Sequence, residues 1–325
     1  MTTRTIVLGA AITLAAIAGV TTASAQSYPS RAITVIIPFA GGSASDVVTR
    51  IMLDKMSKSM GQPLIVENRP GAGGNTGTGA AGKAAPDGYT LVGSGSGPFA
   101  ANKILYRDLG YDPEKDFEVI SPFAYFNIVI VASAKLPVNN LKELIAHAKA
   151  NPGQLNYGSV GIGSSQHLGG EYFQQVAGVK LTHVPYRNIA QYGPDLIAGQ
   201  VPLGFQWLPN VNASLMSGGA KALAVAAKTR MKALPDVPTT AEAGLPDYVA
   251  SGWFAMAAPK GTPKAIVDRI NKEMAAALAD PDVREKFLQQ GAEPSVMPAA
   301  EAAKFVAAEI KKWDGIITKA GIPKI

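Results

Sequence analysis

Two turns rich in glycine and serine carry residue types that bind small anions. PFAGGSASD, residues 38–46, follows an apolar β-branched run at 33–37 and precedes a helical pattern that begins at about Ser45. YGSVGIGSSQH, residues 157–167, has the same layout, with Ser164 and Ser165 opening a predicted helix. Such turns offer free backbone N–H groups, hydroxyls and the positive end of a helix dipole to a carboxylate. A plain tight turn, with Ser45 or Asp46 capping the helix, is the alternative for the first of them.

A third strand end carries a cation. Arg187 and Asn188 follow a predicted strand at 181–184 and precede a helical pattern at 189–198. A guanidinium can bind a carboxylate through two parallel hydrogen bonds, which makes Arg187 a candidate ligand contact. A surface salt bridge is the alternative for the same side chain.

Residues for covalent or metal chemistry are scarce. The chain has three histidines, His147, His167 and His183, and no cysteine, which excludes disulfides, thiol nucleophiles and thiolate metal sites. No serine of the second turn fits G-x-S-x-G, and no histidines fit H-E-x-x-H. His167 falls inside a predicted helix, where a histidine more often packs or caps than acts as a base. We therefore predict no catalytic residue and no metal site.

Residues 77–84, GTGAAGKA, match two nucleotide-binding motifs incompletely. They satisfy G-x-x-x-x-G-K, but Ala84 lacks the hydroxyl that holds Mg²⁺ in a P-loop. They also satisfy G-x-G-x-x-G, but no acidic residue occurs between Gly88 and Arg107, where a dinucleotide site requires one. The segment is predicted to be a glycine loop that allows close helix packing, and no cofactor is expected.

Strand and helix patterns alternate along the chain, which is typical of parallel α/β layers. Further strands are predicted at 64–66, 89–92, 127–132, 156–159, 222–227 and 253–258, and further helices at 141–150, 263–279 and 298–320. A chain of 325 residues is long enough for two domains. Because no linker separates them, 127–132 and 253–258 are the expected crossings. We assign 26–126 and 251–325 to lobe 1 and 127–250 to lobe 2.

The first 25 residues have the pattern of a secretory signal peptide. Arg4 precedes an apolar run from Ile6 to Val20, and Ala23-Ser24-Ala25 forms an A-x-A cleavage signal. Cleavage after Ala25 would release a soluble periplasmic protein; a retained N-terminal anchor is the alternative. The basic residues are scattered over a chain of formal net charge +6, so nucleic-acid binding is not expected.

Seven segments together resemble the Bug receptors of tripartite tricarboxylate transporters. They are YPSR at 28–31, PFAGGSASD at 38–46, VENRPGAGGNTGTGAAGKAAPDGYTL at 66–91, YGSVGIGSSQHLGGE at 157–171, VPYRNIAQYGPDLIAGQV at 184–201, LPDVPTTAEAGLP at 234–246 and GWFAMAAPKGTP at 252–263. The resemblance implies an α/β fold of the type II periplasmic-binding-protein class, with two lobes that close on a ligand. It implies a receptor that delivers a small organic carboxylate to membrane permease subunits, and a monomer suits that role.

The resemblance also assigns roles within the turns. Loop 38–46 would hold one carboxylate through backbone groups and ordered waters, segment 94–99 would line lobe 1, and the helix opening at Ser164 would help from lobe 2. Loop 187–190 and the strand end at Gln206 would tune what else fits. The candidate ligand-binding residues are Phe39, Gly42, Ser43, Asp46, Ser94, Ser96, Ser164, Ser165, His167, Arg187, Asn188 and Gln206.

The sequence departs from the family pattern near the expected pocket. Asn188 stands where the family commonly has glycine, and Pro202 and Gln206 stand where V-D-x-x-F-D would place two acids. Losing an acid makes the pocket less able to pair with an amino group, so we expect a carboxylate without one: a di- or tricarboxylate, a hydroxy acid or, with Trp207 as an apolar wall, an aromatic acid. An exported hydrolase and a sensor that docks on a membrane kinase are the rival functions.

Overall fold

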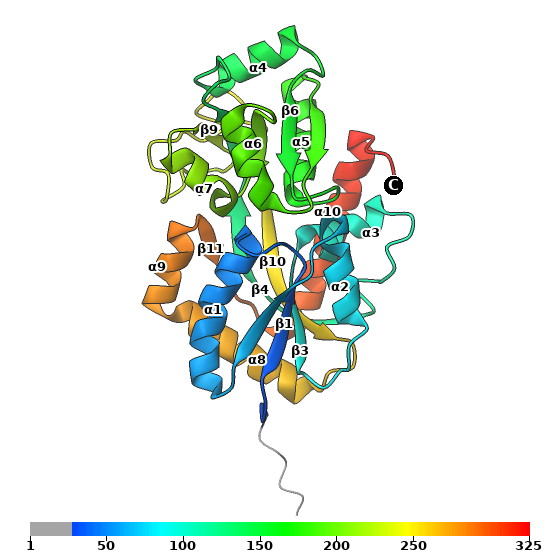
Figure 1. Cartoon of the computed structure of the whole chain (residues 1–325). Helices are drawn as coiled ribbons and strands as arrows, with labels where there is room; N and C mark the ends of the chain where they lie inside the picture. Colours follow the sequence, from blue (N-terminus) through cyan, green and yellow to red (C-terminus); the bar gives the residue numbers. More distant parts are fainter. Residues whose placement is uncertain (1–27) are drawn as a thin grey trace, which may run out of the picture.

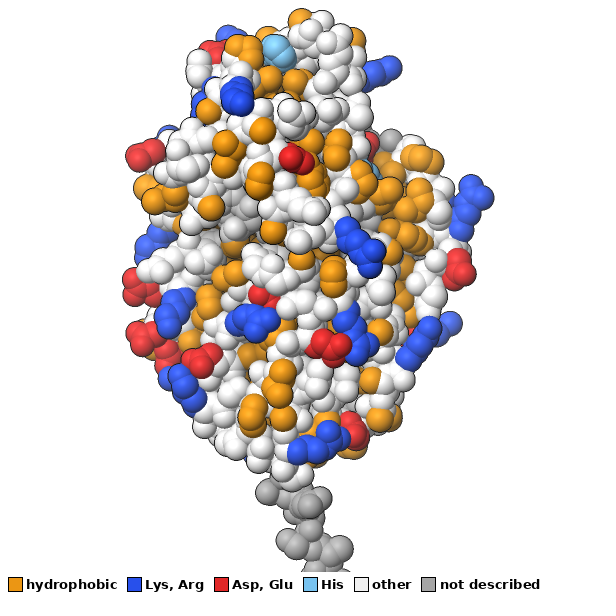
Figure 2. Space-filling view, in the orientation of Figure 1, with side chains coloured by type: hydrophobic (Ala, Val, Ile, Leu, Met, Phe, Trp, Pro, Cys, Tyr) orange, Lys and Arg blue, Asp and Glu red, His pale blue; other side chains and the backbone are white. Residues whose placement is uncertain are grey.

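The computed structural model describes residues 28–325, arranged as two α/β lobes stacked along one long axis (Figure 1). The predicted signal peptide, 1–25, lies outside the described residues. Within the described part of the chain, no helix is both long enough and apolar enough to cross a membrane. Lysine and arginine side chains are interspersed with aspartate and glutamate on the face drawn in Figure 2.

Lobe 1 is built on a six-stranded sheet of order β11-β4-β10-β3-β1-β2. Strands β1, β2 and β3 are parallel, whereas β10 runs antiparallel to β3 and β4. The strands are β1 (Ile33–Ile37), β2 (Leu64–Asn68), β3 (Thr90–Gly95), β4 (Phe117–Asn127), β10 (Ser251–Pro259) and β11 (Ala292–Pro294). The helices of lobe 1 are α1 (Ala44–Met60), α2 (Asn75–Gly82), α3 (Asn102–Leu105), α8 (Lys264–Ala279), α9 (Pro281–Gln289) and α10 (Ala299–Ala320). Two short helical turns, η1 (Ala72–Gly74) and η2 (Gly97–Ala101), belong to the same lobe.

Lobe 2 is built on a five-stranded sheet of order β7-β6-β8-β5-β9. Strand β6 is parallel to both β7 and β8, and β5 is antiparallel to β8 and β9. The strands are β5 (Val129–Ser133), β6 (Asn156–Ser159), β7 (Thr182–Pro185), β8 (Leu203–Gln206) and β9 (Ala220–Val225). The helices are α4 (Leu141–Ala150), α5 (Ser165–Ala177), α6 (Tyr192–Ala198) and α7 (Leu208–Met216), with the short turn η3 (Ile189–Gln191).

Helix α1 shows how local sequence positions the site. Val48, Met52 and Met56 recur every four residues and are all buried, so they fix one face of the helix against the lobe 1 core. Gly61 ends the helix in the left-handed region, at φ 69°. The expected cap, Ser45 or Asp46, is wrong: the N-cap is Ser43 and the helix begins at Ala44. The N-terminus therefore lies closer to the glycine turn than the periodicity indicated.

The chain crosses between the lobes at Ile128. The expected single strand at 127–132 is two strands, because β4 ends at Asn127 in one sheet and β5 begins at Val129 in the other. Three backbone hydrogen bonds join the crossing to its neighbours: Ile128 N to Ala250 O at 2.9 Å, Ala226 N to Ile128 O at 2.8 Å, and Ala250 N to Ala226 O at 3.1 Å. The outgoing and returning chain segments are therefore bonded to each other where they pass between the two sheets. The predicted limits between the lobes, at 126/127 and 250/251, remain a proposal.

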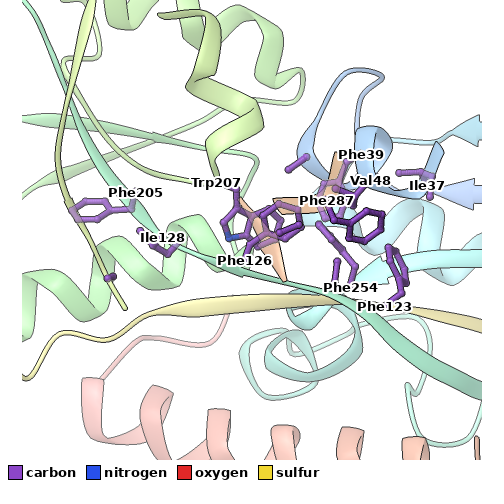
Figure 3. Close-up of a cluster of buried hydrophobic side chains, with 14 of the residues drawn as sticks. Ile37, Phe39, Val48, Phe123, Phe126, Ile128, Phe205, Trp207, Phe254 and Phe287 are labelled. Atoms are coloured by element: carbon purple, nitrogen blue, oxygen red, sulfur yellow. The ribbon is translucent and has the colours of Figure 1, made fainter. Parts of the chain in front are cut away.

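Buried aromatic side chains from both lobes pack together where the lobes meet (Figure 3). Trp207, the residue after β8, lies with its ring centroid 5.2 Å from that of Phe126 and 4.8 Å from that of Phe254, both on lobe 1 strands. Phe254 is in turn 6.3 Å from Phe39, the second residue of the β1–α1 turn. Trp207 is only 4% exposed, so this cluster is an apolar contact between the lobes.

Candidate functional site

The β1–α1 turn is held rigid by its own carboxylate. Asp46 accepts hydrogen bonds from Gly42 N at 2.9 Å, from Arg50 Nε at 3.0 Å and from Asn68 Nδ2 at 2.9 Å. Burial by itself would raise the pKa of Asp46, but the hydrogen bonds from Arg50, Gly42 and Asn68 bring it below its usual value. Gly42 adopts φ 77°, where a side chain would be strained. The predicted residues Gly42 and Asp46 thus shape the loop together.

The N-terminus of α1 presents backbone donors towards lobe 2. Ser43, the N-cap, makes no side-chain capping bond; its hydroxyl lies 3.1 Å from that of Ser45. Ala44 N donates to Asn210 Oδ1, in lobe 2, at 3.0 Å. Within the described residues, Ser45 N and Asp46 N have no protein acceptor. These two N–H groups are therefore available to an anion.

The N-terminus of α5 presents backbone donors from lobe 2. Ser164 caps it, accepting from His167 N at 3.3 Å and donating to Gly161 O at 2.7 Å. Ser165 Oγ lies 2.7 Å from Ser96 Oγ in lobe 1, and both hydroxyls are buried. Among the residues described, Ser165 N and Gln166 N find no protein acceptor. Two helix N-termini, one in each lobe, thus each keep two free donors.

Ser94 and Ser96 differ in the hydrogen-bond partners of their hydroxyl groups. Ser94 Oγ lies 2.7 Å from Thr78 Oγ1 inside lobe 1, and neither side chain is exposed. Ser96 is the member of segment 94–99 whose hydroxyl bonds to the opposite lobe. A ligand role for Ser94 remains a prediction, and its observed contact ties β3 to α2.

Four glycines allow the lobes to meet backbone to backbone; we call Gly73, Gly97, Gly161 and Gly163 the glycine seam. A Cβ on Gly97 would lie 2.5 Å from Gly163 O, and one on Gly73 would lie 2.1 Å from Ile162 O. A Cβ on Gly161 would lie 3.0 Å from Gly73 Cα. No side chain fits at such distances, so the structure is a closed form in which the lobes touch.

Buried polar atoms without protein partners gather along the same interface. They are both side-chain polar atoms of Gln166, Trp207 Nε1, Asn75 Nδ2 and Asn102 Oδ1. Gln166 is 1% exposed and Asn102 is fully buried, and Asn102 Oδ1 would lie 2.1 Å from a Cβ on Gly163. Buried polar atoms are nearly always hydrogen-bonded, so this cluster indicates a place where a ligand or ordered water supplies the missing partners.

His167 and His183 support the second turn together, with ring centroids 4.3 Å apart and ring planes tilted by 43°. His167 Nδ1 accepts from Gly163 N at 3.2 Å, and His183 Nε2 lies 2.6 Å from Ser159 Oγ. Burial lowers the pKa of His167 to about 4. Burial, helped by His167 and opposed by the charge of Glu171, lowers the pKa of His183 to about 3. Both rings are therefore neutral at pH 7 and hold backbone in place.

Ser159 and His183 are close enough to be a nucleophile and its base, but their surroundings give them another role. Ser159 is fully buried, and its Oγ also accepts from Gly161 N at 3.0 Å. That bond closes the turn before α5 and leaves the hydroxyl no access to a substrate. No three His, Asp or Glu side chains in residues 28–325 gather as metal ligands would.

Hollows lie on both sides of loop 187–190. One, of about 480 Å³, is lined by Gly71–Gly73, Tyr106, Val160–Ile162 and Pro185–Arg187; the other, of about 390 Å³, by Gly41, Gly42, Ile189, Ala190, Gly193, Pro194, Pro209 and Asn210 among others. Arg187 is exposed and has no ion-pair partner within the described chain. Asn188 accepts from Ala190 N at 3.1 Å. Another hollow, of about 690 Å³, lies between α5, α10 and 247–251.

Gln206 is fully buried and spans two neighbours. Its Nε2 donates to Gly158 O at 2.8 Å, and its Oε1 accepts from Asn210 Nδ2 at 3.0 Å. Direct ligand contact by Gln206 remains a prediction; both polar atoms of its side chain contact the protein. Sequence reasoning missed Asn210 and Gln166, although Asn210 follows Gln206 by four residues across a strand-to-helix junction and Gln166 is next to the predicted Ser165.

Comparison with known proteins identifies relatives that match most of this chain. A family model described as "Tripartite tricarboxylate transporter family receptor" matches residues 48–322. Protein BugT of Bordetella pertussis is 38% identical over 322 residues, 99% of this chain and 98% of that protein. A protein of R. palustris solved with adipate has a TM-score of 0.88 at 35% identity, covering 92% of this chain and all of that one. MatC of Rhodopseudomonas palustris, solved with bound malate, has a TM-score of 0.81 at 32% identity, covering 89% and 100%.

The two-lobed α/β fold is that of a periplasmic binding protein: the periplasmic binding protein BugD is 35% identical and has a TM-score of 0.87 over 92% of this chain. The chain belongs to the tripartite tricarboxylate transporter receptor family.

Proposed function

We propose that this protein is a periplasmic receptor that captures a small organic carboxylate and delivers it to the membrane permease subunits of a tripartite tricarboxylate transporter. Residues 1–25 direct export and are removed after Ala25. The mature receptor is a monomer that binds its ligand without making or breaking a covalent bond.

The observation that carries this proposal is the pair of helix N-termini with unpaired donors. Ser45 N and Asp46 N in lobe 1, and Ser165 N and Gln166 N in lobe 2, have no protein acceptor in the described structure. A carboxylate bound by either set is stabilised by the helix dipole, and one that touches both favours the closed form over the open one. Ligand capture and lobe closure are then a single equilibrium.

The charges around the interface favour a ligand without an amino group. Asp46 is engaged by Arg50, Gly42 and Asn68, and Glu171 accepts from Tyr157 at 2.7 Å. An ammonium group would thus meet no free carboxylate at these positions. Arg187, exposed at the rim of a hollow, is available for a second carboxylate. The adipate and malate of the two solved relatives make dicarboxylates the first class to test.

Thermal unfolding of residues 26–325 against a panel of carboxylates tests the proposal. A ligand at a hundred times its dissociation constant should add about 2.7 kcal/mol to the free energy of unfolding, which raises the Tm of a chain this size by several degrees. The protein is first unfolded, dialysed and refolded so that no ligand is carried over. If amino acids shift the Tm more than every dicarboxylate does, the assignment of ligand class is wrong. If no acid shifts it, the receptor assignment fails and hydrolysis of carboxylic esters is assayed next.

A further inference from the structure

A chain of three hydrogen bonds joins the core of lobe 2 to the N-terminus of α1 in lobe 1. Gly158 O accepts from Gln206 Nε2 at 2.8 Å, Gln206 Oε1 accepts from Asn210 Nδ2 at 3.0 Å, and Asn210 Oδ1 accepts from Ala44 N at 3.0 Å. Gln206 ends β8, and Asn210 lies in the first turn of α7. The last bond crosses between the lobes.

The orientation of both amides in this chain is fixed by its ends. Gly158 O can only accept, so Gln206 must turn its NH₂ group towards it and leave Oε1 facing Asn210. Ala44 N can only donate, so Asn210 must present Oδ1 to it and NH₂ to Gln206. The two requirements agree, and Gln206 is fully buried, so its side chain is held in place. Asn210 Oδ1 is therefore a preset acceptor for one specific N–H group.

We propose that Asn210 is a lobe-closing latch that occupies the first N–H group of α1 from the opposite lobe and leaves the next two to the ligand carboxylate. The inference rests on the proposed function for the ligand, but not for the latch itself. An amide suits the position because it accepts a hydrogen bond from the helix N-terminus without a negative charge that would repel a carboxylate bound beside it. Ligand-free protein that already samples the closed form has a higher apparent affinity for ligand.

The latch predicts a behaviour of the protein before any ligand is added. In ligand-free wild type, the Ala44 amide should exchange with solvent more slowly than an unpaired amide, whereas Asn210→Ala should remove that protection. Asn212→Ala is the matched control, because Asn212 lies on the exposed side of α7 and makes no described hydrogen bond. Small-angle scattering on the same samples should show a larger radius of gyration for Asn210→Ala only.

Binding of adipate and malate, as probes, then tests the consequence. Asn210→Ala should weaken binding of the probe that the wild type prefers about fivefold, the equivalent of about 1 kcal/mol for one hydrogen bond. Asn212→Ala should bind as the wild type does. Unchanged Ala44 exchange, size and affinity in Asn210→Ala would overturn the latch even if dicarboxylates bind. Lost Ala44 protection in Asn210→Ala, in a protein that binds no carboxylate, would support the latch and refute the proposed function.

Discussion

Replacing Gly97 with alanine should weaken carboxylate binding about a hundredfold while leaving each lobe folded. Gly97 is the first residue of η2, and its φ is not in the left-handed region, so an alanine is free of backbone strain there. The added Cβ would lie 2.5 Å from Gly163 O, and its other nearest atoms are Gly163 C at 3.4 Å and Ser164 Cα at 3.5 Å. All three belong to lobe 2, so the clash arises only when the lobes close.

The expected loss of affinity depends on which atoms must move to make room for the new Cβ. A backbone carbonyl cannot rotate away as a long side chain can, so one lobe must shift or the closed form must be given up. Overpacking of this kind typically costs about 1–3 kcal/mol, and the upper end corresponds to about a hundredfold in affinity. Isothermal titration of the stabilising carboxylate into wild type and Gly97→Ala would measure it.

A matched variant separates lobe closure from the general effect of glycine replacement. Gly315 lies exposed in α10, with no atom within 4 Å of an added Cβ and no positive φ. Gly315→Ala should bind as the wild type does and gain slightly in stability. Equal affinity in Gly97→Ala and wild type would mean that ligand does not bind in the closed arrangement with the glycine seam in contact.

Much of the fold could be predicted because its signals are local. The β-branched run of β1, the four-residue spacing in α1 and the glycine turns before α1 and α5 all lie within a few residues of the structure they specify. The fold class was confirmed for that reason. The segment 77–84, expected as a glycine loop, lies mostly in helix α2, where Gly77 and Gly82 pack against neighbouring elements too closely for larger residues.

Elements that depend on distant partners were harder to predict. Strand β4 contains Pro122, which normally argues against a central strand, but the pairing of β4 with β10 is irregular near it, where the ladder has register shifts. Helices α7 and α9 were missed, and 127–132 was read as one strand because nothing in NIVIVA marks the change of sheet at Ile128. Which sheet a strand joins depends on its tertiary contacts and not on its local sequence.

The candidate site also has parts that depend on local sequence and parts that depend on distant partners. The sequence indicated both helix N-termini, since each depends on a turn and a cap. It did not indicate Asn210, because that residue meets Ala44 only when two lobes from separate parts of the chain close. Its assignment of Gln206 and His167 to the ligand stays a prediction; within the protein, Gln206 contacts Gly158 and Asn210, and His167 contacts Gly163 N.

Acid should destabilise the protein through the His167–His183 pair, at pH values where most carboxylates are still ionised. Burial lowers the pKa of His167 from 6.5 to about 4, so the folded protein favours the neutral ring. The folded state is therefore fully stable above pH 6.5 and loses stability as the pH falls, because the unfolded chain takes up a proton that the folded chain does not. Each unit of pKa is worth about 1.4 kcal/mol, so the loss for His167 reaches about 3 kcal/mol near pH 4.

Urea unfolding at intervals between pH 7 and pH 4.5 would measure this decline, and His167→Gln should make it shallower. Glutamine can still accept from Gly163 N, so the second turn keeps its hydrogen bond while the proton-binding group is removed. His147→Gln, on α4, is the control and should leave the slope unchanged. If His167→Gln loses stability as steeply as the wild type between pH 6.5 and 4.5, the buried ring is not the source. If the decline becomes shallower, the turn that presents Ser164 and Ser165 to the ligand depends on a neutral histidine, and ligand affinity should fall over the same pH range.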